Sequence, residues 1–347
     1  MVRAALAELG PVPALAVVPR GASGSGSGSR SGSPVAGLPR RSILRASHPE
    51  PDASSVRAAR RALAFFAGFG AEDAILCLIS GGASSLVALP RPGVTLERKR
   101  RAVARLAASG ATIAEINRLR RSLSAVKGGG LARATGARLV TLVLSDVAGD
   151  DPGVVGSGLT IRSRRRRSDV VRVVGSNRGG LEAAAAAARR LGLAPRIERR
   201  RLDGEARAAG ADVAKKALAL PPGSALIAGG ETVVHLRLRL RLPLPRRRGR
   251  GGRCLELALG AAPVLRGSAV ALLAAGSDGV DGSSGAAGAF CDGGTLRRAM
   301  RRRLDPDRAL REHDTRPFFR ALGDLYVTGA TGTNVGDWVF AVRPREP

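Results

Sequence analysis

The chain has 347 residues, a formal net charge of +29, 44% hydrophobic residues and 3% aromatic residues. This length can bury a sizeable core, and two domains are a better expectation than one. The apolar runs fall well short of the roughly 20 residues that a membrane-spanning helix needs. Glu8, Pro11 and Pro13 interrupt the apolar N-terminal stretch, which argues against an export signal. The composition therefore argues against a fibre and against a membrane protein.

The positive charge comes almost entirely from arginine. Of 57 basic residues only four are lysines, namely Lys99, Lys127, Lys215 and Lys216. This bias, with abundant Ala and Gly, is typical of a GC-rich coding sequence. Arginine runs are more often solvated loops than recognition surfaces, and few aromatic side chains are present to stack on bases. The sequence therefore argues against nucleic acid as a partner, and an Arg-driven nucleic-acid binder is kept only as a third hypothesis.

The three cysteines, Cys77, Cys254 and Cys291, are far apart, and no CxxC pair occurs. An odd number without such spacing argues against structural zinc and indicates a reducing compartment. We therefore expect a cytoplasmic protein.

In chain order, a short strand is predicted within ALAVVPRG, and a Ser/Gly-rich linker follows at residues 21–34. A helical run, SSVRAARRALAFFAGF, comes next, then an apolar strand at 74–79 and a long helical stretch that begins LERKRRAVARLAAS. This alternation is typical of a parallel sheet covered by helices on both faces. We predict an α/β fold with a strand and linker at 1–44, a Rossmann-like doubly wound domain at 45–220, and a smaller mixed α/β domain at 223–343.

Further strands are predicted at 138–144, 170–174, 225–228, 270–275 and 325–327. Each predicted strand from residue 74 onward opens into a loop of Gly, Ser, Asp, Asn or Thr. One such loop alone is best interpreted as a turn. Repeated after every strand, these loops predict the rim of a ligand site, because ligands bind at the carboxyl ends of strands in doubly wound folds.

Two of these segments carry groups suited to anions. The stretch ISGGASSL offers backbone N–H groups and hydroxyls at Ser80, Gly81, Gly82 and Ser84, although it lacks P-loop spacing. The stretch NRLRRSLSAVKGGGLA places Asn117 and Lys127 near one face of a helix; an exposed basic face is the alternative. The last loop, TGATGTN, has glycines that suit a bound phosphate, and its candidate residues are Thr331, Gly332, Thr333 and Asn334.

Carboxylates follow two other strands. SDVAGDDP contains Asp146 and Asp150, and GSDGVDG contains Asp278. Such oxygens suit Mg²⁺, while an Asp-rich turn is the alternative. In GGET, Gly230 and Glu231 are further candidates, and the glutamate could orient a basic partner or cap the next segment. The histidines occupy no triad-like context, which argues against a hydrolase.

Taken together, the motifs resemble the type-2 glycerate kinase family (glycerate 2-kinases), whose C-terminal half is the MOFRL domain. The resemblance runs from about residue 45 to 343 through ASHPEPDASS, LISGGASSLVALP, SGATIAEINRLRRSLSAVKGGGLA, VLSDVAGDDPGVVGSGLT, VVGSN, AGGETVV, GGRCLEL, AAGSDGVDGSSGAAGA and TGATGTNVGD. It implies transfer of the γ-phosphoryl group of ATP to the 2-hydroxyl of D-glycerate, with Mg²⁺. Members are often labelled hydroxypyruvate reductase, but no GxGxxG with a downstream acid occurs here, which favours the kinase.

The resemblance also implies roles for individual residues. The SGG and TGTN loops would cradle phosphate or substrate oxygens, and Asp146, Asp150 or Asp278 would approach the metal. Arg253, in the position of the family's GGR motif, would stabilise charge on the transferring group. Lys127 would bind the substrate carboxylate.

The chain departs from the family pattern in three places. Members ordinarily have a glycine-rich GKA segment ahead of the equivalent of ALAVVPRG, and several tens of residues where this chain has only RSRRRRSD. The usual GGRNQE is here GGRCLE, so that Cys254 and Leu255 replace polar residues. The missing GKA segment implies an N-terminally truncated member, and the departures together fit a truncated gene model, a decaying gene or a divergent enzyme. A degenerate, non-catalytic member that still binds nucleotide is the alternative hypothesis to an active kinase.

Overall fold

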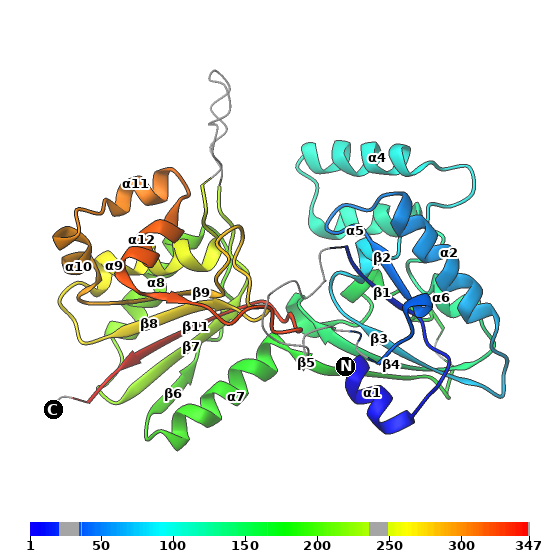
Figure 1. Cartoon of the computed structure of the whole chain (residues 1–347), viewed down its shortest axis with the longest axis horizontal. Coiled ribbons are helices and arrows are strands. Elements are labelled where there is room, and N and C mark those ends of the chain that lie inside the picture. Colours follow the sequence, from blue (N-terminus) through cyan, green and yellow to red (C-terminus); the bar gives the residue numbers. More distant parts are fainter. Residues whose placement is uncertain (21–34, 36, 165, 236–248, 346–347) are drawn as a thin grey trace. The chain divides into compact units, whose positions relative to one another are not determined.

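The structure is a computed structural model, and it describes residues 1–20, 35, 37–164, 166–235 and 249–345. The Ser/Gly-rich linker predicted at 21–34 lies outside the described residues. Helices and strands alternate, as expected for an α/β protein (Figure 1). Contacts between residues divide the chain into two compact units, Met1–Val174 and Gly175–Pro347.

The first unit contains two small sheets. Strands β1 (Ala16–Pro19) and β2 (Ile43–Ala46) pair in parallel. A second sheet has the order β3-β4-β5, with β3 (Ala74–Ile79) parallel to β4 (Arg138–Ser145), and β5 (Val170–Ser176) leads into the second unit. The helices are α1 (Val2–Leu9), α2 (Ala53–Ala67), α3 (Ala83–Leu86), α4 (Leu96–Ala108), α5 (Ile113–Ser122) and α6 (Gly130–Arg133), with 3-10 turns η1 (Arg40–Ser42), η2 (Ala148–Asp150) and η3 (Val155–Ser157).

Helix α2 shows how local sequence sets an element. Asp52 caps it by accepting a hydrogen bond from the Ser54 backbone N–H at 2.8 Å, which satisfies an otherwise unpaired donor. Its apolar residues recur at helical spacing and form one buried stripe. That stripe packs with the inner residues of β3 and β4, and the shared core includes Ala58, Ala59, Ala62, Phe66, Ile75, Cys77 and Leu139.

The short arginine-rich segment before β5 is tied to the sheet by a buried ion pair. Arg162 Nε lies 3.0 Å from Asp169 Oδ2, with side-chain exposures of 10% and 6%. The Arg162 guanidinium also donates to the backbone oxygens of Thr135 and Ala137, and Asp169 accepts from the Leu139 backbone N–H at 3.0 Å. Here an arginine of the run stabilises the fold rather than facing solvent.

Replacing Asp169 with alanine is expected to destabilise the first unit by about 3–5 kcal/mol, because Arg162 is left as an unpaired buried charge. Hydrogen exchange of the β4 amides would measure the loss. The matched control is Glu182→Ala, which breaks the exposed Arg178–Glu182 pair (58% and 59% exposed) and should cost under about 1 kcal/mol. Unchanged protection of β4 in the Asp169 variant would contradict this role.

The second unit is built on one mixed sheet of order β10-β9-β8-β11-β7-β6. Its parallel pair is β6–β7, while β11 runs antiparallel between β7 and β8. The strands are β6 (Ala194–Ile197), β7 (Ser224–Gly230), β8 (Ala271–Gly276), β9 (Gly288–Asp292), β10 (Leu325–Tyr326) and β11 (Asp337–Arg343). The helices are α7 (Asn177–Arg190), α8 (Ala206–Leu218), α9 (Arg253–Leu265), α10 (Thr295–Arg301), α11 (Pro306–Arg311) and α12 (Thr315–Leu322).

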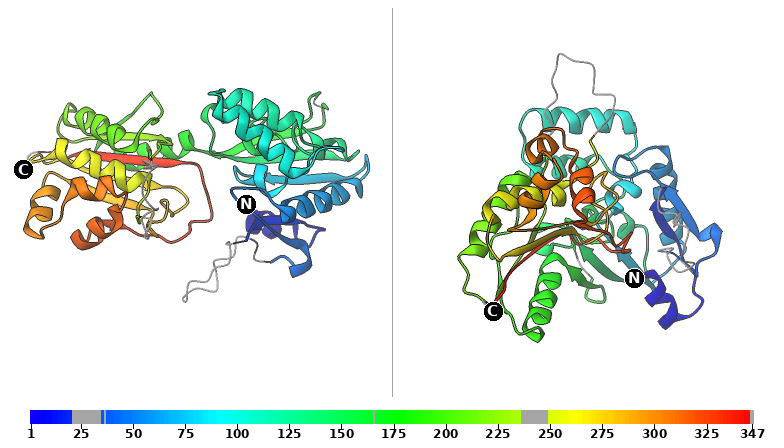
Figure 2. Two further views of the ribbon diagram at one scale, coloured as in Figure 1. Left: turned by 90° about the horizontal axis from the view of Figure 1, so that it is seen from above. Right: turned by 60° about the vertical axis from the view of Figure 1, so that its left-hand side comes forward.

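Both faces of this sheet are covered by helices (Figure 2). Helices α8, α9 and α12 bury one face, with Leu226, Leu272 and Val339 in their shared core. Helix α7 covers the other face and packs on Ile227 and Phe340. Alternate residues of β7 and β11 therefore serve opposite layers, as the two-residue period of a strand requires.

The contact division falls near residue 174, whereas the predicted domain boundary lies at 220–223. Residues between these positions form α7, β6 and α8, and β6 pairs with β7. Helix α8 lies so close to α9 that a Cβ at Gly210 would be 2.0 Å from the Leu257 carbonyl oxygen. The alternation of strands and helices in the sequence predicts these elements, but it does not predict which sheet they join. Among the described residues, no helix is both long and apolar enough to cross a membrane.

Candidate functional site

In the first unit, the loops that follow β3 and β4 meet. A Cβ built at Gly81 would lie 1.7 Å from Asp146 Oδ2, so only glycine allows this approach. At Gly82 a Cβ would lie 3.2 Å from the His48 ring. The structure thus brings the predicted SGG loop and the predicted Asp146 together at the carboxyl ends of two parallel strands.

Three chain segments converge beside this loop. The Lys127 ammonium donates a hydrogen bond to Ser84 Oγ, and Ser84 Oγ lies 3.0 Å from Ser157 Oγ. Ser157 has a φ of 60°, a conformation that is uncommon outside glycine and concentrates at functional sites. The Gly128 backbone N–H donates to the Ser157 carbonyl at 2.9 Å, which fixes the lysine loop against the serine loop.

We call Lys99, Arg120 and Lys127 the basic cluster. Burial is the main cause that lowers the pKa of Lys127 from 10.5 to about 7, and the positive charges of Lys99 and Arg120 add to this effect. Burial also lowers the pKa of Lys99 to about 8, with a smaller contribution from the positive charge of Arg120. The Lys99 ammonium is buried without a hydrogen-bond partner, and within the described ranges no ion pair joins the cluster to a carboxylate. Such a site favours an anion, because a bound negative charge would offset the cost of burying the lysines.

The predicted Asn117 belongs to the same neighbourhood, because its Oδ1 accepts from Arg120 Nη1 at 3.4 Å. Lys99, Arg120 and Ser157 were not predicted. A signal existed for Lys99: in a chain with only four lysines among 57 basic residues, a lysine marks a position where arginine is not equivalent. Nothing in the sequence pattern singles out Arg120 or Ser157.

The three predicted metal ligands are divided between the two units. Asp146 and Asp150 belong to the first unit and Asp278 to the second. Asp150 has a φ of 52° beside Gly149 in η2, and Asp151 accepts from the Gly153 N–H at 2.8 Å in the same turn. In the part of the chain that the structure describes, no three His, Cys, Asp or Glu side chains group as a metal site.

In the second unit, Arg253 begins α9 and lies between two carboxylates. Its Nη1 is 2.5 Å from Glu231 Oε1, and its Nε is 3.1 Å from Asp337 Oδ2. Burial acts to lower the pKa of Arg253, but Asp337 and Glu231 together raise it above its ordinary value. Burial raises the pKa of Asp337, and Arg253 opposes this. Arg253 is therefore a fixed, permanently charged guanidinium that the predicted Glu231 helps to hold.

The loop that follows β10 is tied to the loop that follows β8. Thr331 Oγ1 donates to the Ser277 carbonyl at 2.6 Å, and the Thr331 N–H donates to the Asp278 carbonyl at 3.1 Å. Asn334 Oδ1 accepts from the Gly336 N–H at 3.0 Å. Gly332 has a φ of 76° and no neighbour within 4 Å of a built Cβ, so its backbone is open to a ligand. The backbone carbonyl of Thr333 accepts a hydrogen bond from Thr331 Oγ1 at 3.4 Å.

Other residues in or beside these loops are explained by packing or by helix capping. A Cβ at Gly230 would lie 2.1 Å from the Leu202 carbonyl oxygen, so packing alone requires this glycine. Asp281 accepts from the Cys254 and Leu255 backbone N–H groups at 3.1 and 2.9 Å, which caps α9. Burial raises the pKa of Asp281 to about 6. The side chains of Cys254 and Leu255 are buried in the core.

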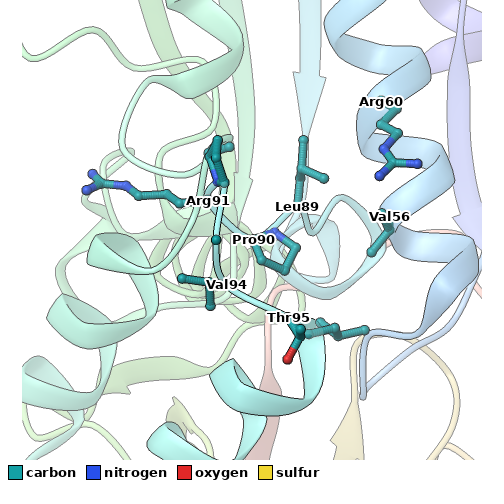
Figure 3. A pocket seen from close by; sticks show the side chains of 11 residues that line it. Val56, Arg60, Leu89, Pro90, Arg91, Val94 and Thr95 are labelled. Atoms are coloured by element: carbon teal, nitrogen blue, oxygen red, sulfur yellow. The ribbon is translucent and has the colours of Figure 1, made fainter.

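A cavity of about 500 Å³ lies beside α2 in the first unit, lined by Val56, Arg60, Leu89, Pro90, Arg91, Pro92, Gly93, Val94, Thr95, Leu96 and Ala125 (Figure 3). Its walls are mainly apolar, and the guanidinium groups of Arg60 and Arg91 point apart. None of the predicted site residues lines it. The basic cluster and Arg253 are better candidates, because they hold the fixed charge that binding an anion requires.

Two family models match the chain. Residues 1–191 match a domain of unknown function, DUF4147, and residues 224–337 match the MOFRL family. A D-glycerate 2-kinase from Thermotoga maritima is 36% identical over 86% of this chain and 79% of its own length. A protein from Agrobacterium vitis, provisionally named hydroxypyruvate reductase, is 39% identical over 85% of this chain and 76% of its own length.

Solved structures agree with these matches. The crystal structure of glycerate kinase from Thermotoga maritima has a TM-score of 0.84 and 33% identity, covering 99% of this chain and 88% of that chain. A structure from Pyrococcus horikoshii has a TM-score of 0.71 and 29% identity, covering 88% of this chain and 79% of the other. The family expected from the motifs is thereby confirmed. The chain belongs to the type-2 glycerate kinase family, with a MOFRL domain in its C-terminal part.

Proposed function

We propose that this chain is a glycerate 2-kinase, which transfers the γ-phosphoryl group of ATP to the 2-hydroxyl of D-glycerate and releases 2-phospho-D-glycerate and ADP. The basic cluster carries the proposal: buried lysines without an acidic partner, next to two serine hydroxyls, suit a small hydroxy acid. A cytoplasmic location is part of the proposal, and it is supported by the free, buried cysteines Cys77, Cys254 and Cys291.

In the proposed mode of substrate binding, the glycerate carboxylate lies on the basic cluster. Lys127 and Lys99 supply the charge, and Ser84 and Ser157 exchange hydrogen bonds with the substrate hydroxyls. A bound carboxylate raises the pKa of both lysines, because an opposite charge nearby favours the ionised form. The same interaction fixes the orientation of the hydroxyl that accepts the phosphoryl group.

Arg253 is proposed to stabilise the charge on the transferring phosphoryl group. Glu231 and Asp337 hold its guanidinium in place, so little reorganisation is needed when charge develops in the transition state. The open backbone around Gly332, with Thr331, Thr333 and Asn334, is proposed to hold ATP phosphate oxygens. Phosphoryl transfer depends mainly on such positioning and charge stabilisation.

The donor set of the second unit fits Mg²⁺. A Cβ at Gly276 would lie 3.0 Å from Asp278 Oδ1 and 3.5 Å from Asp337 Oδ1, so two carboxylates lie near one backbone position. Asp337 Oδ2 is buried and makes no hydrogen bond, although Arg253 Nε is 3.1 Å away. Mg²⁺ is commonly held by one or two carboxylates plus substrate phosphates. Asp278 would hold it, with Asp146 and Asp150 as candidates in the first unit. When bound, the ion neutralises charge on the phosphates.

The product decides between this function and its alternatives. With ATP, Mg²⁺ and D-glycerate, phosphorus NMR should show 2-phosphoglycerate. Formation of 3-phosphoglycerate would contradict the proposed acceptor hydroxyl. Oxidation of a reduced nicotinamide cofactor by hydroxypyruvate would instead support the reductase name that some relatives carry. A folded chain that binds ATP but turns nothing over would support the degenerate, non-catalytic alternative.

A further inference from the structure

A second cavity, in the second unit, is lined mainly by arginine. It measures about 360 Å³, and we call it the arginine cavity; its lining residues are Arg250, Arg302, Arg316, Pro317, Arg320 and Ala321. Helix α12, labelled in Figure 1, supplies four of these residues. Arg302 directly follows α10, and Arg250 precedes α9. Arg253, proposed above to act in phosphoryl transfer, is not among the lining residues.

The charge of this cavity is not balanced by the protein. None of its four arginines forms an ion pair with a carboxylate of the described residues. Carboxylates are available in the same region: Arg298 pairs with Asp292 and Asp324 at 2.8 and 2.7 Å, and these pairs lie outside the cavity lining. Four guanidinium groups around one open cavity repel one another, and a bound anion would offset this repulsion.

The side chains that line the cavity are partly anchored and still have free donors. Arg302 donates through Nη1 to the Ala321 carbonyl. The backbone is fixed as well: the Arg316 backbone N–H donates to the Arg250 carbonyl at 2.8 Å, and the Arg250 backbone N–H donates to Asp314 Oδ1 at 2.7 Å. Arg316 Nε is buried without any hydrogen-bond partner. Buried donors nearly always have an acceptor, so the protein alone does not satisfy the Arg316 guanidinium.

We propose that the arginine cavity binds a compact, multiply charged phosphate group, such as the diphosphate of a small molecule. Guanidinium forks match phosphate oxygens in a bidentate manner. The N-terminal turn of α12, which contains Arg316 and Pro317, adds the positive end of a helix dipole. The volume suits one small ligand.

Isothermal titration calorimetry of the full chain with inorganic pyrophosphate, at low salt and without divalent ions, tests the proposal. Saturable binding is expected. Arg316→Gln and the exposed Arg320→Gln should each weaken it about tenfold or more. The matched control, Arg301→Gln, removes an exposed charge from α10 outside the cavity and should change the affinity less than about twofold. The Arg253→Gln variant should keep the arginine-cavity binding.

Three outcomes would overturn the proposal. The first is an absence of saturable pyrophosphate binding to the folded wild-type chain. The second is an equal loss of affinity in Arg301→Gln and Arg320→Gln, which would mean that only diffuse charge attracts the anion. The third outcome uses a short single-stranded oligonucleotide as a second probe. If the oligonucleotide binds more tightly than pyrophosphate, and if Arg320→Gln abolishes that binding, the surface would be assigned to a nucleic-acid backbone instead.

Discussion

Replacing Arg253 with alanine is expected to lower kcat by about 10²–10³, with a smaller change in the KM for glycerate. The guanidinium is proposed to act on charge that develops only in the transition state, and removal of one such donor typically has this effect. Steady-state kinetics with ATP, Mg²⁺ and D-glycerate would measure it. Arg253→Lys should recover little, because a lysine cannot reach Glu231 and Asp337 with the same planar fork.

A loss of activity in Arg253→Ala could also arise from damage to the fold, since Asp337 would lose its partner. Arg298→Ala is the matched control, because Arg298 is also held between two carboxylates, Asp292 and Asp324. It should lose comparable thermal stability and keep wild-type kcat. Equal loss of kcat in both variants would remove Arg253 from the mechanism and leave it a structural role.

Replacing Lys127 with methionine is expected to stabilise the first unit at pH 7 by on the order of 3 kcal/mol while abolishing glycerate binding. The pKa of Lys127 is lowered from 10.5 to about 7 in the folded chain. The unfolded chain therefore binds more protons between pH 7 and 10.5, so wild-type stability rises with pH across that window. The advantage of the methionine variant is present in full below pH 7 and disappears as pH rises above about 10.

Hydrogen exchange of the β3 and β4 amides, followed against pH, would measure this difference. Lys215→Met is the matched control, because Lys215 is exposed on α8 and its removal should change stability by less than about 0.5 kcal/mol. A Lys127→Met variant that is less stable than wild type at pH 7 would show that the lysine is not a buried, costly charge.

The same cluster makes glycerate binding depend on pH. Because the pKa values of Lys127 and Lys99 are lowered to about 7 and about 8, the free cluster loses charge between pH 7 and 9. Affinity for glycerate should therefore fall by about tenfold or more over this range, and binding at pH 8 should take up protons. Calorimetry in two buffers of different ionisation enthalpy would show the uptake. Lys127→Met is expected to bind no glycerate and therefore to give no binding heat in either buffer.

Much of the loop chemistry could be predicted from the sequence, because each strand is short, apolar and followed by small polar residues. The SGG loop does lie at the end of β3 beside Asp146, and Thr331 does contact the loop that carries Asp278. Ser84 and Lys127, predicted from separate motifs, are in direct contact. The approach of the SGG loop to Asp146 could be expected, because the carboxyl ends of the parallel strands β3 and β4 meet at one edge of a sheet. The roles assigned to these loop residues stay predictions.

Other features depend on tertiary contacts that no local pattern encodes. Lys99 is the one buried residue of α4 although the helix also contains Leu96, Val103 and Leu106, and its burial follows only from the packing around it. Asp337 pairs with Arg253 across 84 residues of sequence, and it was not predicted because it begins a strand rather than a polar loop. Strand β6 contains Pro195 and Arg196 among four residues, so its composition gives no strand signal.

The most direct test of the central claim is glycerate-dependent ADP release by the purified chain in the presence of ATP and Mg²⁺. Our account predicts that wild type and Arg298→Ala release ADP only when D-glycerate is added, and that folded Arg253→Ala does so at least about 10² times more slowly. A folded wild-type chain whose ADP release is absent or independent of glycerate would contradict the proposed kinase activity.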